Sequence, residues 1–244
     1  MTEHFQAIIT AAGTSEPWSL GGYVGPKNLT PVDGIPLLSR AAASYSSPGG
    51  QTVIAVPTNE YADYEQQYLA LGREHVAKIL PVNPHVKGAL VTALISAHLM
   101  DLNAPLVIAP GDSFIDGGSQ RHVVELLARD LEAGTITFNS RGDRWSYVAL
   151  NRDGLVTQVA EKRVIGQNAT TGVFVFRSAE IFIDAAEWCL LNKIQTNDTF
   201  YVSSTLNYIV SQGGKVGVAG IEREAFSYYS RQDDMGRQAF NGSL

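Results

Sequence analysis

Phe5-Gln6-Ala7-Ile8-Ile9-Thr10-Ala11-Ala12-Gly13 is a short apolar run, rich in β-branched residues, that ends in two alanines and a glycine. Such a run is typical of a strand that is buried on both faces of a sheet. A glycine directly after the strand lets the backbone approach a phosphate closely, and the N–H groups of the loop can then face its oxygens. The stretch predicts the first strand of an α/β sheet, with a ligand-binding loop at its carboxyl end.

The pattern continues towards the middle of the chain as short apolar runs that alternate with segments of helical periodicity. Strands are expected at 52–57, 76–80 and 105–109, and helices at 35–45, 59–71, 88–99 and 122–131. Strands that alternate with helices form parallel sheets, because each connection crosses over through a helix. The first half of the chain therefore predicts parallel strands with helices on both faces.

The second half is richer in strands. We expect strands at 135–139, 145–151, 156–160, 172–176, 215–220 and 226–230, and helices at 179–191, 199–212 and 233–240. Asp153-Gly154 is a hairpin signal between two of these strands. No linker, repeat or low-complexity segment divides the chain. We predict one domain over residues 1–244, with a mixed, mostly parallel sheet between two layers of helices.

Composition excludes several classes of function. The formal net charge of the 244 residues is −6, which argues against a nucleic-acid partner because such proteins present a basic surface. Cys189 is the only cysteine, which excludes an internal disulfide and fits a reducing compartment. The N-terminal residues do not resemble a signal peptide, and no apolar run is long enough to span a bilayer. We expect a soluble cytoplasmic protein with no membrane partner.

Three features fall at the predicted carboxyl ends of strands: the Gly13 loop, Gly88, and Asp112 after Gly111. Residues 14–31 carry several glycines and prolines, so we expect an irregular functional loop there. Within it, Lys27 is placed to reach a bound phosphate, although the glycine and the lysine alone are more often a structural loop with a solvated lysine. A carboxylate after a buried strand can hold a divalent cation against phosphate oxygens, or it can cap a turn.

An ordered series of motifs resembles the sugar-1-phosphate nucleotidylyltransferase family. The opening signature of that family is similar to Ala11-Ala12-Gly13 followed by Pro26-Lys27-Asn28-Leu29-Thr30-Pro31-Val32-Asp33-Gly34-Ile35-Pro36-Leu37-Leu38. Later motifs of the family resemble, in order, residues 87–94, Gly111-Asp112, Tyr147, residues 153–156, Glu161-Lys162 and residues 171–176. Residues 200–213 resemble a late helix of members from capsule and surface-polysaccharide pathways. The match extends through nearly the whole chain.

The resemblance implies a Rossmann-like nucleotide-diphospho-sugar transferase fold and transfer of a nucleotidyl group from an NTP to a small phosphorylated acceptor, with release of pyrophosphate. It implies nucleotide binding by Ala11, Ala12, Gly13, Thr14, Lys27, Gly88 and Asp112, with Lys27 and Asp112 as catalytic residues and Asp112 as the ligand of Mg²⁺. It implies acceptor binding by Tyr147, Glu161, Lys162, Thr171 and Gly172. Both substrates are anions, so the reaction needs positioning and cations and no protein nucleophile.

One departure from the family pattern bears on activity. The family loop reads Gly-x-Gly-Thr-Arg, whereas this chain has Glu16-Pro17, with proline where the arginine belongs. Proline cannot replace the bidentate contact of a guanidinium with phosphate. Arg231 or a partner subunit could supply the cation, and Asp233 or Asp234 lies where some members have a second metal ligand, although either is more typical of a helix start.

Three hypotheses therefore stand. The first is an active nucleotidyltransferase, and the second is a non-catalytic paralogue that binds nucleotides or sugar nucleotides. The third, a glycosyltransferase, is the weakest, since a DxD motif after the fourth strand is absent from Gly111-Asp112-Ser113-Phe114. The sequence leaves open the base, the acceptor (a hexose-1-phosphate, phosphocholine or another phospho-metabolite) and whether the chain forms a homo-oligomer.

Overall fold

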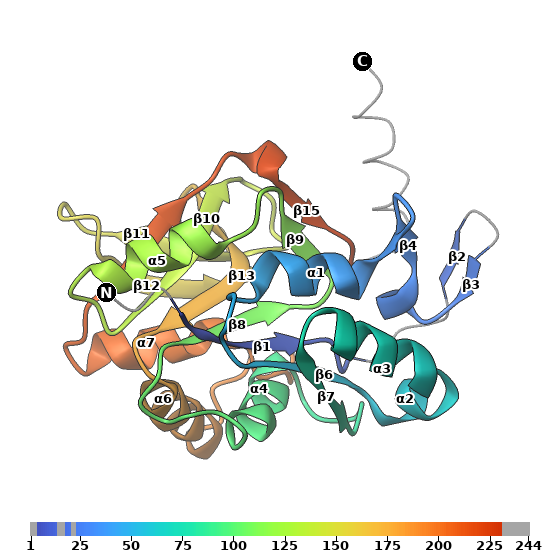
Figure 1. Cartoon of the computed structure of the whole chain (residues 1–244). Coiled ribbons are helices and arrows are strands. Elements are labelled where there is room, and N and C mark those ends of the chain that lie inside the picture. Colours follow the sequence, from blue (N-terminus) through green and yellow to red (C-terminus); the bar gives the residue numbers. More distant parts are fainter. Residues whose placement is uncertain (1–3, 14–17, 21–22, 231–244) are drawn as a thin grey trace.

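The computed structural model of the chain describes residues 4–13, 18–20 and 23–230. Within them, nine strands form one mixed sheet (Figure 1). Along its main path the strands are, in order, β12 (Val156–Glu161), β11 (Ser146–Leu150), β13 (Asn168–Phe176), β8 (Leu106–Pro110), β1 (Gln6–Thr10), β6 (Thr52–Pro57) and β7 (Ala77–Val82). Strand β10 (Ala133–Asn139) pairs with β13, and β14 (Val216–Gly220) pairs with β10. Strands β12 and β13 run antiparallel to their neighbours, and the other seven of the nine point in one direction. The predicted mixed, mostly parallel sheet is confirmed.

The parallel part of the sheet is built from the apolar runs of the first half of the chain. Its strands are β1 (Gln6–Thr10), β6 (Thr52–Pro57), β7 (Ala77–Val82) and β8 (Leu106–Pro110). Strand β1 lies between β6 and β8 and is parallel to both. Residues 11–13, which follow β1, therefore emerge at the middle of the carboxyl edge of this part of the sheet.

The remaining strands extend the sheet beyond β8. They are β10 (Ala133–Asn139), β11 (Ser146–Leu150), β12 (Val156–Glu161), β13 (Asn168–Phe176) and β14 (Val216–Gly220). Strand β13 is antiparallel to β8, so its amino-terminal part lies at the carboxyl end of β8. That arrangement brings residues from the second half of the chain to the same edge of the sheet as Gly13.

Helices cover both faces of the sheet (Figure 1). On one face lie α1 (Leu37–Tyr45), α3 (Glu65–Glu74) and α5 (Gln120–Ala128), and on the other lie α4 (Ala89–Ala97), α6 (Ala179–Leu191) and α7 (Ser203–Ser211). Neighbouring strand residues point to opposite faces, so Ile9 packs in the core under the first group and Ile8 in the core under the second. Two cores on the two faces of one sheet confirm the predicted three-layer α/β fold.

The helix expected at 59–71 is divided in two. Helix α2 (Thr58–Asp63) ends at Tyr64, whose backbone leaves the helical region at φ −126° and ψ 30°, and α3 follows. In one continuous helix, Glu60 and Tyr68 would be about 12 Å apart along the axis. The break allows the Tyr68 hydroxyl to donate to Glu60 Oε2 at 2.8 Å, and that contact has a role in the site described below.

The expectation that residues 14–31 hold no regular element was wrong. Strands β2 (Trp18–Leu20) and β3 (Tyr23–Gly25) form a hairpin, and the short 3-10 helix η1 (Lys27–Leu29) follows. The diglycine at positions 21 and 22, between two short segments that each begin with an aromatic residue, was the available signal. A second small hairpin, β4 (Pro31–Val32) with β5 (Ile35–Pro36), replaces the start of the helix expected at 35–45.

One further pair of strands lies outside the main sheet: β9 (Ser113–Ile115) pairs with β15 (Phe226–Tyr228), after the short helix η2 (Arg223–Ala225). The helix expected at 233–240 lies outside the described residues, as do Thr14, Glu16, Pro17, Arg231, Asp233 and Asp234. Among the helices of the described part, none has both the length and the apolar character needed to cross a membrane.

Candidate functional site

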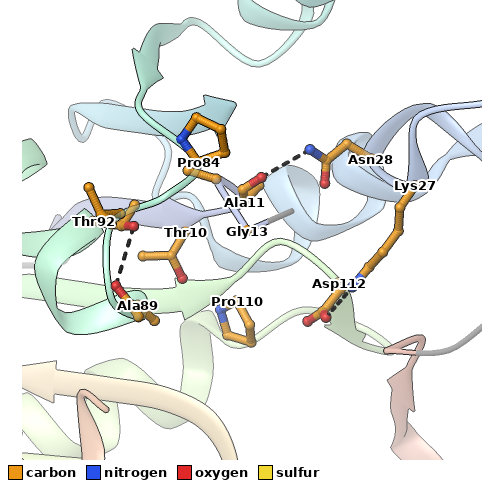
Figure 2. Close-up of a pocket in the computed structure, with 13 residues that line it drawn as sticks. Thr10, Ala11, Gly13, Lys27, Asn28, Pro84, Ala89, Thr92, Pro110 and Asp112 are labelled. Atoms are coloured by element: carbon orange, nitrogen blue, oxygen red, sulfur yellow. Dashed lines mark hydrogen bonds and ion pairs between the residues drawn. The ribbon is translucent and has the colours of Figure 1, made fainter. Parts of the chain in front are cut away.

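A cavity of about 390 Å³ lies at the carboxyl ends of β1 and β8 (Figure 2). It is lined by Thr10, Ala11, Ala12, Gly13, Lys27, Asn28, Pro84, Val86, Gly88, Ala89, Thr92, Pro110 and Asp112. Its volume is within the range of small-ligand sites. Every residue that we predicted to bind the nucleotide lines this cavity, apart from Thr14, which is outside the described part of the chain.

The loop after β1 is held from two sides. The Ala11 N–H donates to the Ala55 carbonyl at 2.9 Å, and the Ala11 carbonyl accepts from Asn28 Nδ2 at 3.0 Å. Ala11 and Ala12 are buried, whereas Gly13 is exposed and would meet no atom within 4 Å if it carried a Cβ. In this conformation Gly13 is therefore not required by packing, and the open space beside it belongs to the cavity.

Lys27 points across the cavity towards Asp112 (Figure 2). Its Nζ lies 2.6 Å from Asp112 Oδ2 and 5.7 Å from the centre of the Trp18 ring. The two charged side chains are only 16% and 22% exposed, so water screens their attraction less than it would at the surface. Lys27 is the only cationic side chain among the described residues that line the cavity.

The position of Asp112 depends on close packing of two strand ends. A Cβ at Gly111 would lie 2.6 Å from the Cβ of Ala11, so only glycine lets the end of β8 approach the end of β1 this closely. The Asp112 carbonyl accepts the N–H of Tyr229 at 2.9 Å, at the β9–β15 pair. The backbone of Asp112 is thereby held beside the Gly13 loop.

The described residues contain no group of three or more acidic, histidine or cysteine side chains that could enclose a metal ion. Mg²⁺ does not need such a cage in phosphoryl-transfer enzymes, because one or two carboxylates and the substrate phosphates hold it. A single half-buried carboxylate that faces a cavity of this kind fits that mode of binding. Asp112 alone is therefore compatible with Mg²⁺ only when a phosphate ligand is also present.

Behind the cavity, Glu60 forms a polar network with Asn28 and Tyr68. Glu60 Oε2 accepts from Tyr68 at 2.8 Å and from Asn28 Nδ2 at 3.2 Å. Burial raises the pKa of the Glu60 carboxyl, and hydrogen bonds from Tyr68 and Asn28, together with the charge of Lys27, oppose that rise. Asn28 itself is only 5% exposed. Its amide joins the turn that carries Lys27 to the loop that carries Gly13.

Gly88 precedes α4 with φ 106°, a conformation that side chains rarely adopt. A Cβ at this position would lie 2.3 Å from the Phe200 carbonyl oxygen. The same carbonyl accepts the N–H of Leu90 at 3.3 Å, and the Phe200 N–H donates to the Lys87 carbonyl at 3.0 Å. Gly88 is thus required by the close approach of residues 199–200, in addition to its place on the cavity wall.

The predicted acceptor residues Glu161 and Lys162 lie near the same edge of the sheet but do not line this cavity. Glu161 Oε2 accepts from the hydroxyls of Ser146 and Ser203, the latter at 2.8 Å, and Glu161 lines a second cavity of about 260 Å³ beside α7. Lys162 has φ 52°, and its Nζ lies 5.1 Å from the centre of the Tyr201 ring.

The other three acceptor residues have different environments. Gly172 is half-buried with φ 82° and approaches Pro110, two residues before Asp112. Thr171 is buried, and its hydroxyl donates to the Ile136 carbonyl at 3.2 Å. Tyr147 is fully buried, and its hydroxyl donates to the Gly142 carbonyl at 2.5 Å. No part of the Tyr147 side chain is exposed in this structure, and its contact with an acceptor stays a prediction.

Sequence reasoning missed several residues of the site. Asn28 was part of a matched motif but was given no role, and the lining residues Pro84, Val86 and Thr92 were not singled out. A signal existed for Pro84 and Val86, since they follow a predicted strand at the carboxyl edge of the sheet. Nothing in the sequence indicated that Glu60 and Tyr68 would support the cavity, because they meet only through the break between α2 and α3.

No protein-family model matches the sequence, and no curated protein matches it either. The fold is similar to those of solved structures. One is the nucleoside-diphosphate-sugar pyrophosphorylase of Vibrio cholerae, with a TM-score of 0.75 and 18% identity over 95% of this chain and 98% of that one. Another is the inositol-1-phosphate CTP transferase of T. maritima, with a TM-score of 0.70 and 14% identity over 98% of this chain and 94% of that one.

Proposed function

We propose that the chain is a nucleotidyltransferase that transfers a nucleotidyl group from an NTP to a sugar-1-phosphate or a similar small phosphorylated acceptor and releases pyrophosphate. The observation that carries the proposal is the cavity that unites the Gly13 loop, Lys27 and Asp112 at the carboxyl ends of β1 and β8. The names of the two similar structures, a nucleoside-diphosphate-sugar pyrophosphorylase and an inositol-1-phosphate CTP transferase, support the same kind of reaction.

The proposed reaction requires few groups beyond those that line this cavity. An oxygen of the acceptor phosphate attacks the α-phosphorus of the NTP in line with the bond to pyrophosphate, which leaves as that bond breaks. Both reactants are anions, so the site must orient them and neutralise the charge that develops. In the proposal, residues 11–13 and Gly88 position the nucleotide, and Lys27 neutralises phosphate charge in the transition state.

Mg²⁺ is the proposed cofactor, with Asp112 as its protein ligand. When bound, it would neutralise phosphate charge and hold the phosphate chain in one geometry. On the acceptor side, we propose that Lys162 meets the acceptor phosphate and that Glu161 accepts hydroxyl groups. The two serines that hold Glu161 fix its carboxylate at the end of β12.

The test is pyrophosphate release from each NTP in the presence of Mg²⁺ and a panel of sugar-1-phosphates with phosphocholine added. Asp112→Ala should abolish turnover, and Lys27→Ala should lower kcat/KM by about 100-fold to 1000-fold, as the loss of one transition-state contact does. Lys78→Ala, at an exposed lysine of β7, is the matched control and should retain activity. Full activity of both site variants would contradict the assignment of the site.

A non-catalytic nucleotide-binding paralogue is the second candidate. The observation in its favour is Pro17, which stands where the resembled family has its phosphate-binding arginine. Nucleotide binding without pyrophosphate release for every NTP and acceptor would favour this alternative over the enzyme.

A further inference from the structure

The ion pair between Lys27 and Asp112 joins the two groups to which the proposed function gives opposite tasks. Lys27 should contact phosphate, and Asp112 should bind a metal ion, yet their charged atoms lie 2.6 Å apart. An ammonium group at that distance occupies the side of the carboxylate that faces it. Asp112 cannot bind a divalent cation at that oxygen, and Lys27 cannot bind a phosphate fully, while the pair persists.

The pair should also lower the affinity of the cavity for a metal-free polyphosphate. Among the described lining residues, Lys27 and Asp112 are the only charged side chains, and their charges cancel. A metal-free polyphosphate would have to approach a carboxylate and would find the one lysine already paired. Like charges forced together in a half-buried site are strongly unfavourable.

A divalent cation reverses this balance. It would replace the ammonium group at Asp112, and the lysine would then be free to meet the phosphates that arrive with the cation. The backbone at Lys27 need not move, since its carbonyl is fixed by the N–H of Thr30 at 3.1 Å in the turn η1. Rotation of the long lysine side chain is sufficient.

We propose that the Lys27–Asp112 pair makes the site selective for the metal complex of the nucleotide: Asp112 sequesters Lys27 from metal-free polyphosphate, and the cation that accompanies the substrate releases it. The inference rests on the proposed function, because it takes the cavity to be a polyphosphate site. It adds the form in which the nucleotide binds and the residue that enforces that form.

The experiment measures binding of inorganic tripolyphosphate by calorimetry, which needs neither the correct base nor turnover. In EDTA, Asp112→Asn should bind tripolyphosphate about tenfold more tightly than the wild type, within the range usual for coupled sites. With excess Mg²⁺, the wild type should gain about tenfold in affinity over its own value in EDTA, and Asp112→Asn should lose most of that gain.

A double-mutant cycle separates release of Lys27 from simple loss of a negative charge. In a Lys27→Met background, the Asp112→Asn change still removes a negative charge but releases no lysine, so its gain in affinity in EDTA should be several-fold smaller than the gain with Lys27 present. Asp116→Asn, at an exposed aspartate four residues along the chain, should have little effect. Thermal melts confirm that each variant is folded, and Asp112→Ala replaces Asp112→Asn in the comparison if the latter does not fold.

The outcomes distinguish this inference from the proposed function. A gain for Asp112→Asn in EDTA that is several-fold larger with Lys27 than in the Lys27→Met background supports the inference, even if no NTP is turned over. Unchanged or weaker binding by Asp112→Asn in EDTA overturns it, as does a gain that is equally large without Lys27. Pyrophosphate release would in either case keep the proposed function standing. Absence of any tripolyphosphate or nucleotide binding, with or without Mg²⁺, overturns both.

Discussion

Replacing Asn28 by alanine should lower the free energy of unfolding by about 2 kcal/mol, because one buried amide donates to the buried Ala11 and to the half-buried Glu60. Asn28 Nδ2 donates to the Ala11 carbonyl at 3.0 Å and to Glu60 Oε2 at 3.2 Å. The Tyr68 hydroxyl oxygen also accepts from it, at 3.4 Å. The residue is 5% exposed, so water cannot simply take the place of the amide. The same substitution loosens the connection between the Lys27 turn and the Gly13 loop.

The magnitude follows from what each acceptor loses. A buried acceptor left without its donor costs about 1–3 kcal/mol, and more when it carries charge. Glu60 still accepts from Tyr68, and its carboxyl can take up a proton. The free-energy cost of removing the Asn28 donor from Glu60 is therefore at the lower end of that range. A destabilisation of about 2 kcal/mol corresponds to a decrease in melting temperature of about 4–8 °C for a chain of this size.

Asn28→Asp discriminates between the loss of a donor and the loss of volume. Aspartate has the shape of asparagine but cannot donate when ionised, and it places a second carboxylate beside Glu60. If hydrogen bonding dominates, Asn28→Asp should destabilise at least as much as Asn28→Ala at about pH 8 and should recover as the pH falls towards the carboxyl pKa values. If packing dominates, Asn28→Asp should be the milder change at every pH.

The assay is urea unfolding followed by far-ultraviolet circular dichroism at several pH values, with the slopes required to agree between variants. Asn103→Ala, at an exposed asparagine, is the control and should leave the free energy of unfolding within about 0.5 kcal/mol of the wild type. An Asn28→Asp protein more stable than Asn28→Ala at pH 8 would refute the donor argument.

Three further outcomes are expected. Gly88→Ala should lower the free energy of unfolding in urea by about 2–4 kcal/mol, because φ is 106° and the new Cβ would lie 2.3 Å from the Phe200 carbonyl oxygen. A decrease below about 1 kcal/mol would show that residues 199–200 can move aside. Because burial raises the pKa of Glu60, the folded state binds its proton more tightly than the unfolded chain, so the stability that Glu60 contributes is complete below about pH 4.3 and is lost as the pH rises through the raised value. The difference in unfolding free energy between wild type and Glu60→Gln should therefore fall from pH 4 to pH 7, and a rise would contradict the sign. Burial raises the pKa of the Cys189 thiol to about 11, so iodoacetamide at about pH 8 should label the native chain slowly and the guanidinium-unfolded chain rapidly; equal rates would rule out a buried thiol.

The sequence was sufficient to predict the parallel strands and the edge of the sheet at which they end, because both follow from apolar runs that alternate with helical segments. The run that ends at Gly13 and the run before Asp112 are both apolar and β-branched, so each predicted a buried parallel strand. Adjacent parallel strands place their carboxyl ends together, which is why Gly13 and Asp112 could be expected in one site before any coordinates were known. The structure adds the reason for the close approach, since only a glycine at position 111 avoids the Cβ of Ala11.

What the sequence did not indicate depends on contacts between distant residues. Tyr61, Tyr64 and Tyr68 have helical spacing, so one helix was the natural prediction, and the break at Tyr64 is favoured by the tertiary contact of Tyr68 with Glu60. Tyr147 matched a family motif, but whether its side chain faces a ligand or the core depends on the register of β11. In this fold Tyr147 pairs with Ala160 and Ala169 and is fully buried.

Pro17, which stands where the resembled family has an arginine, bears on the charge of the cavity. With proline at position 17, Lys27 is the only described cationic side chain on the cavity wall, and Asp112 neutralises it. A triphosphate carries several negative charges, which one lysine cannot balance. If the chain binds an NTP and neither Arg231 nor a partner subunit supplies a cation, a metal ion has to neutralise the rest of that charge. Affinity for the nucleotide should therefore depend steeply on Mg²⁺, and the proline and the ion pair together lead to the same requirement for a metal-bound substrate.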